Sequence, residues 1–449
     1  MNTRTAPQAA APNLVPLAAT LLAGAIAALL DSTITTMALD ELSRELAVPV
    51  TTIQWVTTAY VLAMTAVIPL VGWSVGRFGA RTMWLVTLSL FLLGSVLSGL
   101  AWSAGSLIGF RVVQGLGGGM ILPLSQLTLA RAAGPERLGR MMGVAGLIGQ
   151  IAPISGPILG GVLVDGWGWR WVFFANVPIV VISLIMTLRF FPRDDEPSDR
   201  PFDPVGTALL PIGVIALLYA LTGTGSGLGV PAPVVGAVGV ALVSAFVVRS
   251  LRHRAPTLLD LRLLRDRSFR SGTIMMFALG VTTWGPMFLL PLYYQQLRDL
   301  SALDAGLALA PQSLGLALGF LAAGRYADRL PPRPLAVAGM TVAAAATIPF
   351  AFATASSDTL LLGTALLIRG IGYGIGSLPV SVALYRTLRP AEIPDATSTG
   401  NVVQRIGAAT GTALMAVILQ TSGFTAALTW MLALTAAGAA MSLILPGRR

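Results

Sequence analysis

The stretch LVPLAATLLAGAIAALLDSTITTMAL, residues 14–39, decides the fold. It is long enough to cross about 30 Å of hydrocarbon as a helix, and it carries one carboxylate, Asp31, well inside its apolar run. A charge at that depth costs roughly 2.5 to 3.5 kcal/mol even on the lenient insertion scale, and such residues usually mark an ion or substrate path. The alternative is an aspartate that caps or bends a buried helix.

The composition is that of a protein embedded in lipid. Hydrophobic residues make up 55% of the 449 residues, charged residues only 11%, and the mean hydropathy is +0.79. Soluble chains carry about 25% charged residues. The absence of cysteine excludes disulfides, thiol nucleophiles and zinc–thiolate sites, and the sole histidine, His253, lies in an arginine-rich loop, so no metal site is expected. We therefore predict an all-α polytopic membrane protein.

Apolar runs of membrane-spanning length recur along the chain after a polar tail at residues 1–13. They lack the alternating pattern of barrel strands, and only helices or closed barrels can span lipid. We predict fourteen transmembrane helices, at residues 14–39, 51–73, 82–101, 104–130, 139–164, 170–191, 205–223, 231–249, 270–295, 303–323, 334–354, 359–385, 401–421 and 423–445.

The arginines predict the orientation of these helices. All 29 basic residues are arginine. With the N-terminus inside, 24 of them, including Arg405, fall on inner segments and helix ends, three fall outside, and Arg111 and Arg369 fall within spans. Cytoplasmic loops carry the excess of positive charge, so we expect both termini, including the tail at residues 1–13, to be cytoplasmic. Positive charge along an inner membrane face attracts anionic lipids, and no nucleic-acid partner is expected.

Two segments recur in the second half of the chain. The loop Gly72–Arg81 resembles Gly324–Arg333, and RVVQGLGGGMILP (111–123) resembles RGIGYGIGSLP (369–379). Parallel halves with a site between them are a transporter architecture. The predicted domains are an N-terminal six-helix bundle at 14–191, a linker at 192–269 with inserted helices seven and eight, and a C-terminal six-helix bundle at 270–449. Within the linker, residues 251–270 read either as an interfacial amphipathic segment or as a solvated linker.

Eight motifs follow one another at characteristic spacings. They are LDSTI (30–34), QWVTTAYVLA (54–63), the Gly72–Arg81 loop, RVVQGLGGG (111–119), GPILGG (156–161), WRWVFFANVP (169–178), PTLLDLRLLRDRSF (256–269) and LPLYYQQ (290–296). Each is weakly specific alone, but their order and spacing together are specific. Over nearly all of residues 14–445 the chain resembles the major facilitator superfamily, and more closely its fourteen-span drug:proton antiporter family.

Asp31 and Arg111 lie at matching depths, each about eight residues from the outer end of its span, so they can pair directly or through water. The resemblance implies that they serve proton coupling, and a purely structural ion pair is the alternative. Gln114, Gly115 and Gly118 share one helical face with Arg111 by their i, i+3, i+4, i+7 spacing, and the glycines let another helix approach.

A further group of residues is expected to act through helix packing and helix ends. In the fifth span small residues form a stripe with two kinking prolines, which the resemblance identifies as the antiporter signature and which is equally a tight packing seam. Arg77 and Arg81 can bond inner helix ends, while Gly76 replaces an acidic residue of the family pattern. The group comprises Gly72, Arg77, Gly79, Arg81, Gly115, Gly118, Gly149, Pro153, Gly156, Pro157, Gly160, Asp328 and Arg329.

A group of polar, aromatic and methionine residues is expected either to line a central amphipathic cavity or to lie in interfacial belts. They are Gln54, Trp55, Tyr60, Gln114, Met275, Met276, Trp284, Tyr293, Tyr294, Gln295 and Arg369. Arg369 either bonds helix carbonyls or faces the cavity. In the second case it would favour neutral or anionic amphiphiles over dications.

Together these features predict a proton-coupled secondary transporter of the inner or plasma membrane that exports amphipathic small molecules. It would use the proton gradient and no cofactor, since the sequence has no Walker A pattern. Its partners would be a small-molecule substrate and membrane lipids, and the chain would be monomeric. A proton-coupled importer, a lipid flippase on the same scaffold and a non-transporting sensor are the alternatives. An enzyme is not expected, because no convergent set of catalytic side chains is present.

Overall fold

The computed structural model of the chain describes residues 14–149, 151–192, 202–221, 231–252, 258–326, 330–389 and 392–447, and these contain helices and no strand. The helices before residue 192 are α1 (Leu14–Met37), α2 (Leu39–Glu45), α3 (Val50–Ile53), α4 (Trp55–Val67), η1 (Ile68–Leu70), α5 (Val71–Phe78), α6 (Ala80–Gly99), α7 (Ala104–Gly149), α8 (Ile151–Trp167), α9 (Arg170–Phe174) and α10 (Asn176–Phe190). Those after it are α11 (Pro204–Leu221), α12 (Ala232–Arg252), η2 (Leu261–Arg265), α13 (Arg267–Leu292), η3 (Tyr293–Leu297), α14 (Ala302–Tyr326), α15 (Pro332–Ala351), α16 (Thr359–Tyr385), α17 (Ile393–Met441) and η4 (Ser442–Ile444).

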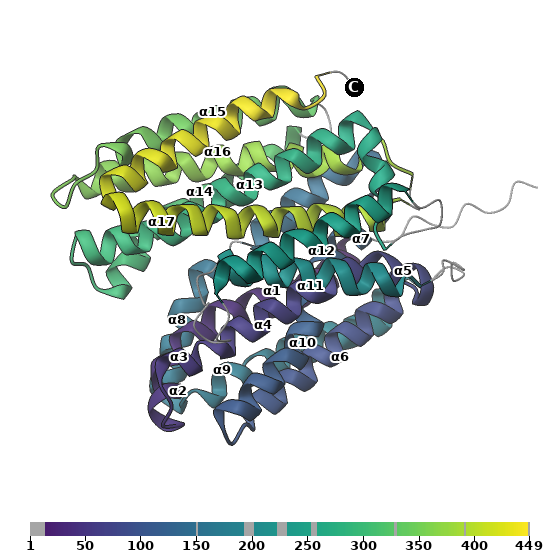
Figure 1. Cartoon of the computed structure of the whole chain (residues 1–449), viewed down its shortest axis with the longest axis horizontal. Coiled ribbons are helices and arrows are strands. Elements are labelled where there is room, and N and C mark those ends of the chain that lie inside the picture. Colours follow the sequence, from purple (N-terminus) through teal and green to yellow (C-terminus); the bar gives the residue numbers. More distant parts are fainter. Residues whose placement is uncertain are drawn as a thin grey trace, which may run out of the picture.

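The helices form two groups. Figure 1 shows α1 to α10 in its lower part and α13 to α17 in its upper part. Helix α7 contacts α14, α16 and α17 across the boundary, and α5 contacts α17. Any site between the two groups is therefore bordered by α7 on one side and by α16 and α17 on the other.

Eleven helices of the described part are long and apolar enough to cross a membrane. Fourteen spans were predicted, and the counts differ because predicted spans run together. The fourth and the start of the fifth lie in α7, and the last two lie in α17, which changes direction at Gly423 (φ 76°, ψ −176°). The predicted seventh span is the shorter apolar helix Pro204–Ala220.

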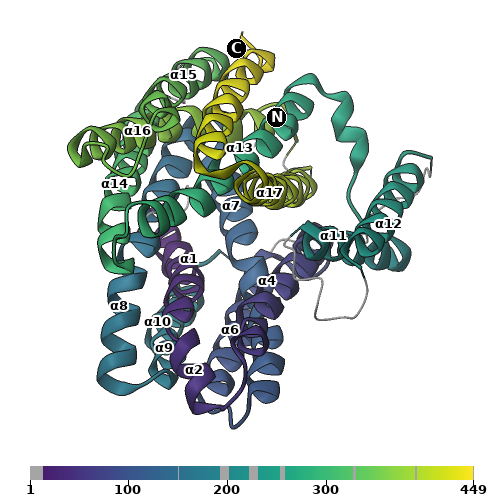
Figure 2. The same ribbon diagram turned by 60° about the vertical axis from the view of Figure 1, so that its left-hand side comes forward.

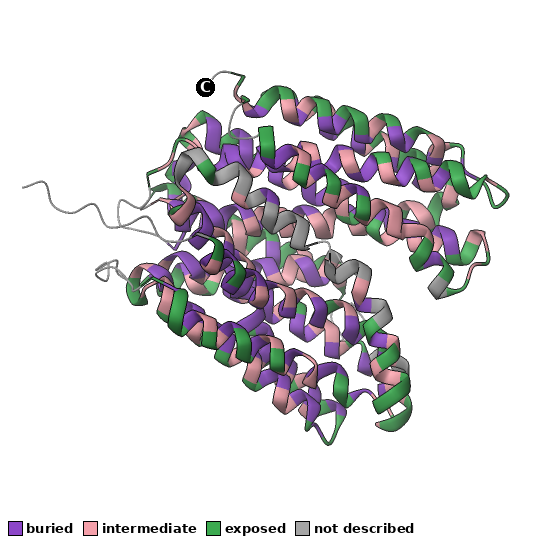
Figure 3. Ribbon diagram, turned by 180° about the vertical axis from the view of Figure 1, so that it is seen from behind, coloured by how far each residue is buried: buried purple, intermediate pink, exposed green. Residues whose placement is uncertain are grey.

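The outer faces of the helices are apolar. Large hydrophobic side chains such as Ile185, Leu314 and Leu360 are more than half exposed, and exposed residues colour the outer surfaces of the bundle in Figure 3. A soluble protein rarely exposes extended apolar surface, so these faces fit contact with lipid. Trp84 is fully buried. It packs so closely on Gly24 that a Cβ atom added to this glycine would lie 2.8 Å from the Trp84 ring.

Helices α11 and α12 pack on each other, and α11 also contacts α4 and α17. In Figure 2 the pair lies to one side of the other helices. The segment that follows it turns its leucines inward: Leu258, Leu259 and Leu261 are buried in a cluster with Ile68 and Leu210. The described part of the segment is thus a packed connection, with Arg262 exposed and the Asp266 carboxylate capping the amide of Phe269 at 2.8 Å.

Candidate functional site

A buried carboxylate lies inside the first group of helices. Asp31 of α1 is fully buried. Its Oδ2 accepts a hydrogen bond from Nη1 of Arg111 on α7 at 2.7 Å. Its Oδ1 accepts from Nε2 of Gln114 at 2.9 Å and from Nδ2 of Asn176, the first residue of α10, at 2.8 Å. These three donors compensate the cost of burying the negative charge.

The paired cation, Arg111, is also fully buried. Its Nε donates to the carbonyl of Val56 at 3.2 Å and its Nη1 donates to Oε1 of Gln114 at 2.7 Å. Its guanidinium carbon lies 3.9 Å from the centroid of the Tyr60 ring, a cation–π contact. The structure therefore brings four of the predicted residues together: Asp31, Tyr60, Arg111 and Gln114.

Two members of this network were missed by sequence reasoning. Oγ of Ser95 on α6 accepts from Gln114 at 3.3 Å and from Asn176 at 3.1 Å, and donates to the carbonyl of Phe173 at 2.8 Å. Neutral polar side chains in an apolar run carry no cost large enough to mark them, and the only signal was the presence of Asn176 in the motif WRWVFFANVP. With them, the network joins α1, α6, α7 and α10.

Close approach of α4 and α6 to α7 brings the side chains of this network within bonding distance of one another. A Cβ on Gly115 of α7 would lie 2.6 Å from the carbonyl oxygen of Tyr60, and one on Gly118 would lie 2.7 Å from the Tyr60 hydroxyl. On the other side, a Cβ on Gly94 of α6 would lie 2.5 Å from the backbone of Gln114. Glycine at these positions lets α4 and α6 pack backbone to backbone against α7.

The second predicted intramembrane arginine, Arg369 of α16, is 1% exposed and is bonded by neutral groups. Its Nε donates to Oγ1 of Thr347 at 3.2 Å, its Nη1 to Oε1 of Gln312 at 2.8 Å, and its Nη2 to the carbonyl of Thr282 at 3.3 Å. The ring of Tyr373 lies 4.7 Å away. Arg369 is thus held by neutral partners among α13, α14, α15 and α16, and it does not line the cavity between the two groups of helices.

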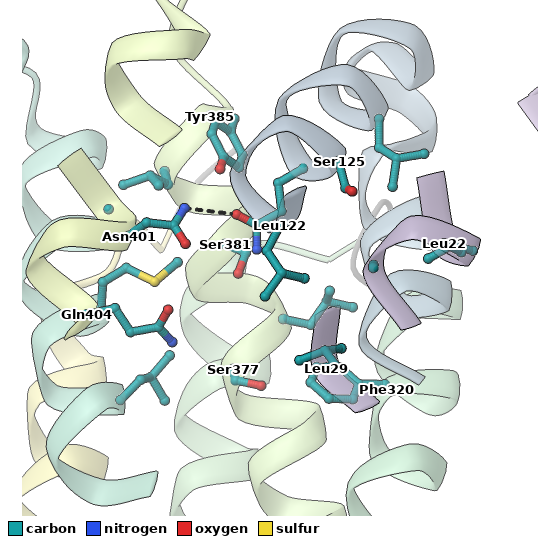
Figure 4. Close-up of a pocket in the computed structure, with 18 residues that line it drawn as sticks. Leu22, Leu29, Leu122, Ser125, Phe320, Ser377, Ser381, Tyr385, Asn401 and Gln404 are labelled. Carbon is teal, nitrogen blue, oxygen red and sulfur yellow. Dashed lines mark hydrogen bonds between the residues drawn. The ribbon is translucent and has the colours of Figure 1, made fainter. Parts of the chain in front are cut away.

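A cavity of about 230 Å³ lies between the two groups of helices. Figure 4 shows its lining, in which Asn401 of α17 donates to Oε1 of Gln126 on α7 at 3.0 Å across the boundary. The lining contains no charged side chain. It consists of Leu22, Ala25, Leu29, Leu122, Ser125, Gln126, Leu129, Met276, Leu279, Phe320, Ser377, Leu378, Ser381, Leu384, Tyr385, Gly400, Asn401 and Gln404.

Of the predicted cavity residues, only Met276 lines this cavity. Gln54 and Gln295 are exposed, and Trp284 is 47% exposed. The others lie elsewhere: Trp55 stacks on Tyr219 of α11, Met275 is in the core, and Tyr293 and Tyr294 are buried, with the Tyr293 hydroxyl donating to the carbonyl of Thr354 at 2.8 Å. Aromatic composition alone did not separate cavity positions from core and surface positions.

The predicted loop after the second span forms the junction of α5 and α6. Gly79 has φ 86°, which ends α5 and begins α6. Nη2 of Arg81 donates to the carbonyl of Leu188 near the end of α10 at 2.9 Å. A Cβ on Gly72 would lie 2.8 Å from Oδ1 of Asp395 on α17, so α5 and the second group meet here without room for a side chain. Arg77 lies in the last turn of α5.

The predicted glycine stripe of the fifth span faces α1. A Cβ on Gly156 of α8 would overlap Thr33, and one on Gly160 would lie 2.9 Å from Cγ of Met37. Gly149 is the last residue of α7, and Pro153 and Pro157 belong to α8. Asp328 and Arg329 lie outside the described residues. The seam thus packs directly against the helix that carries Asp31.

One arginine assigned by sequence to an inner helix end lies inside a helix. Arg405 is twelve residues beyond the start of α17 at Ile393, whereas the predicted span began at residue 401. The polar run of residues 395–400, which obscured the start of the helix in the sequence, is buried. Arg405 therefore lies inside a candidate membrane-spanning helix, as Arg111 and Arg369 do.

Known proteins resemble the chain over most of its length. Residues 21–412 match the family model of the Major Facilitator Superfamily. The "Multidrug resistance protein B homolog" of Mycobacterium tuberculosis is 38% identical over 374 residues, which are 82% of this chain and 69% of that protein. The "Methylenomycin A resistance protein" of Streptomyces coelicolor is 30% identical over 406 residues, 90% of this chain and 85% of that protein.

Solved structures share the fold. The human organic anion transporter MFSD10 (TETRAN) matches with a TM-score of 0.69 at 16% identity, covering 96% of this chain and 100% of that one. At that identity the likeness concerns the fold alone. Given the family match, the similarity to multidrug resistance proteins and the many apolar helices, the chain belongs to the Major Facilitator Superfamily and is a multi-pass membrane transporter, not an enzyme.

Proposed function

We propose that this transporter exports amphipathic small molecules in exchange for protons. It would cross the plasma membrane fourteen times with both termini inside, act as a monomer among membrane lipids, and use the proton gradient without a cofactor. Relatives with multidrug and methylenomycin resistance in their names support export of foreign compounds. The buried Asp31 supports proton coupling, because intramembrane carboxylates commonly carry protons in transporters.

One observation carries the proposal: the two helices that hold the ion pair also line the cavity. Helix α1 contributes Asp31 and the lining residue Leu29, and α7 contributes Arg111 and the lining residue Ser125. A proton on Asp31 would cancel its charge and weaken its bonds to Arg111. The resulting shift of α1 relative to α7 would change the cavity wall, and a ligand in the cavity would in turn bias the same shift.

The Asp31 network lies within one group of helices and the cavity lies between the two groups. Alternating access by rocking of one group against the other would break contacts such as Asn401–Gln126 without separating Asp31 from Arg111. The proton site would thus stay assembled while the cavity opens, and its charge state would determine which arrangement is favoured.

The test is transport in reconstituted vesicles with and without an imposed proton gradient, using a panel of amphipathic fluorescent compounds. We expect wild-type protein to move compounds uphill against the proton flow, and Asp31→Asn to lose uphill transport. Asp304→Asn is the matched control, since it removes an exposed carboxylate at the start of α14. Unchanged uphill transport by Asp31→Asn, or accumulation in the same direction as the protons, would contradict the proposal.

A further inference from the structure

The cavity between the two groups of helices has an apolar side and an amide-bearing side. In Figure 4, Leu22, Leu29 and Phe320 lie opposite Asn401 and Gln404. The three apolar residues belong to α1 and α14, and the two amides belong to α17. None of the described residues that line the cavity is charged. This lining fits a small amphipathic molecule that places its apolar part on one side and an uncharged polar group on the other.

The bonded pair Asn401–Gln126 leaves one donor group and one acceptor unused. The Asn401 amide nitrogen donates to the carbonyl of Thr397 at 2.9 Å and to Oε1 of Gln126 at 3.0 Å. Because a carbonyl only accepts, the bond to Thr397 identifies the nitrogen end of the Asn401 amide, and Gln126 must then present its oxygen. The Asn401 oxygen and the Gln126 nitrogen have no partner among the described residues. A donor from α7 and an acceptor from α17 are therefore available at the cavity wall.

Two more residues of the lining carry unused polar groups. Gln404 follows Asn401 by three residues on α17, and its side chain has no hydrogen bond within the described part of the chain. The hydroxyl oxygen of Ser377 on α16 is buried and has no partner there either. A buried hydroxyl without a hydrogen bond costs free energy, and a polar ligand group that bonds to it recovers that cost.

From this lining we infer that the cavity binds an uncharged amphiphile whose polar end both donates and accepts hydrogen bonds, as a carboxamide does. The inference rests on the proposed function and names its substrate class. An ammonium group would find no carboxylate in the described lining, and both oxygens of Asp31 are bonded elsewhere. A carboxylate would find no cation there and would face the Asn401 oxygen, another acceptor. A carboxamide loses less hydration on entry and can bond to both Gln126 and Asn401.

The test compares three probes that share a phenyl ring and a four-carbon chain: 4-phenylbutanamide, 4-phenylbutylammonium and 4-phenylbutanoate. Dissociation constants are measured by equilibrium dialysis of radiolabelled probes against protein in nanodiscs of zwitterionic lipid, with empty nanodiscs subtracted and no proton gradient. The buffer is at about pH 8, where the ammonium and the carboxylate are both charged. We expect the amide to bind at least about tenfold more tightly than either ion. Equal or tighter binding of an ion, or no protein-dependent binding of the amide, would overturn the inference.

A carboxylate placed in the lining should shift the preference toward the cation. Gln404→Glu should raise the affinity for the ammonium at least about fivefold and lower the affinity for the amide. Gln295→Glu introduces the same charge at an exposed position outside the cavity and should leave all three affinities within about twofold. An unchanged ammonium affinity in Gln404→Glu, or an equal gain in Gln295→Glu, would overturn the inference.

A second pair of variants keeps the test decisive if Gln404→Glu cannot be purified. Ser377→Ala removes a hydroxyl that has no partner in the described structure, so the unfolding temperature should not fall. It should weaken binding of the amide about two- to tenfold. Gln404→Leu should weaken amide binding to a similar degree, because it removes both the donor and the acceptor of that side chain. Unchanged amide affinity in both variants would overturn the inference.

The two proposals fail separately. Binding is measured with Asp31 intact and no gradient, so a preference for the amide that depends on Gln404 stands even if transport proves independent of protons. Conversely, proton-driven export together with ammonium binding as tight as amide binding would remove the inferred substrate class and leave the antiporter proposal in place.

Discussion

Removing both charges of the Asp31–Arg111 pair should cost much less stability than the sum of the losses caused by removing each charge alone. The bonded atoms are 2.7 Å apart and both side chains are fully buried. Loss of one partner leaves a buried charge without its counter-ion, which costs about 3 to 5 kcal/mol. In the double variant Asp31→Asn/Arg111→Gln no charge remains, so we expect the two single losses to overlap by about 3 kcal/mol in a double-mutant cycle.

The assay is the free energy of unfolding of purified protein in mixed micelles titrated with sodium dodecyl sulfate, followed by the fluorescence of the nine tryptophans. Asp304→Asn is the control for removal of an exposed carboxylate. Additivity of the single losses within about 0.5 kcal/mol would refute the reasoning, because residues in direct contact should couple more strongly than that.

Three further predictions follow from other contacts. Gly94→Ala should lower stability by about 1 to 3 kcal/mol and reduce transport, because its Cβ would meet the α7 backbone at 2.5 Å; Gly105→Ala, with open space around it, is the control. Breaking the 3.0 Å bond between Asn401 and Gln126 by Asn401→Ala should raise maleimide labelling of Ser381→Cys about two- to tenfold, and an unchanged rate would show that the bond does not hold the cavity closed. Burial alone would raise the pKa of Asp203, but hydrogen bonds from Arg249 and two backbone amides lower it below the usual value near 3.8. The ionised Asp203 carboxylate therefore stabilises the folded protein fully above that usual value, and this stabilisation is lost as the pH falls through the lower folded pKa. Asp203→Asn should lower the unfolding temperature at pH 7 and match wild type at strongly acid pH. An equal difference at both pH values would contradict this.

The sequence identified the helical class and the family because length, hydropathy and motif order are local properties. It also pointed to the Asp31–Arg111 pair, because both residues are charged and lie at matching depth in apolar runs. Gln114 joined them through helical spacing alone. These inferences need no knowledge of how distant helices pack.

Other parts of the site depend on packing that no local pattern encodes. Ser95 and Asn176 complete the Asp31 network from α6 and α10, and both are neutral residues with ordinary neighbours in the sequence. Arg405 was placed at a helix end because the polar residues before it resemble a loop, although they are buried in α17. The side on which Arg369 lies could not be read from spacing, and the structure surrounds it with neutral partners.

The most direct test of the central claim is substrate-driven proton movement. Vesicles containing the purified protein and an internal pH-sensitive dye receive, without any imposed gradient, a compound that the transport panel has identified. If Asp31 couples the fluxes, entry of the compound will drive protons out and raise the internal pH, and Asp31→Asn will show no pH change while still binding the compound. Acidification of the interior, or the same pH change in Asp31→Asn, would contradict the account.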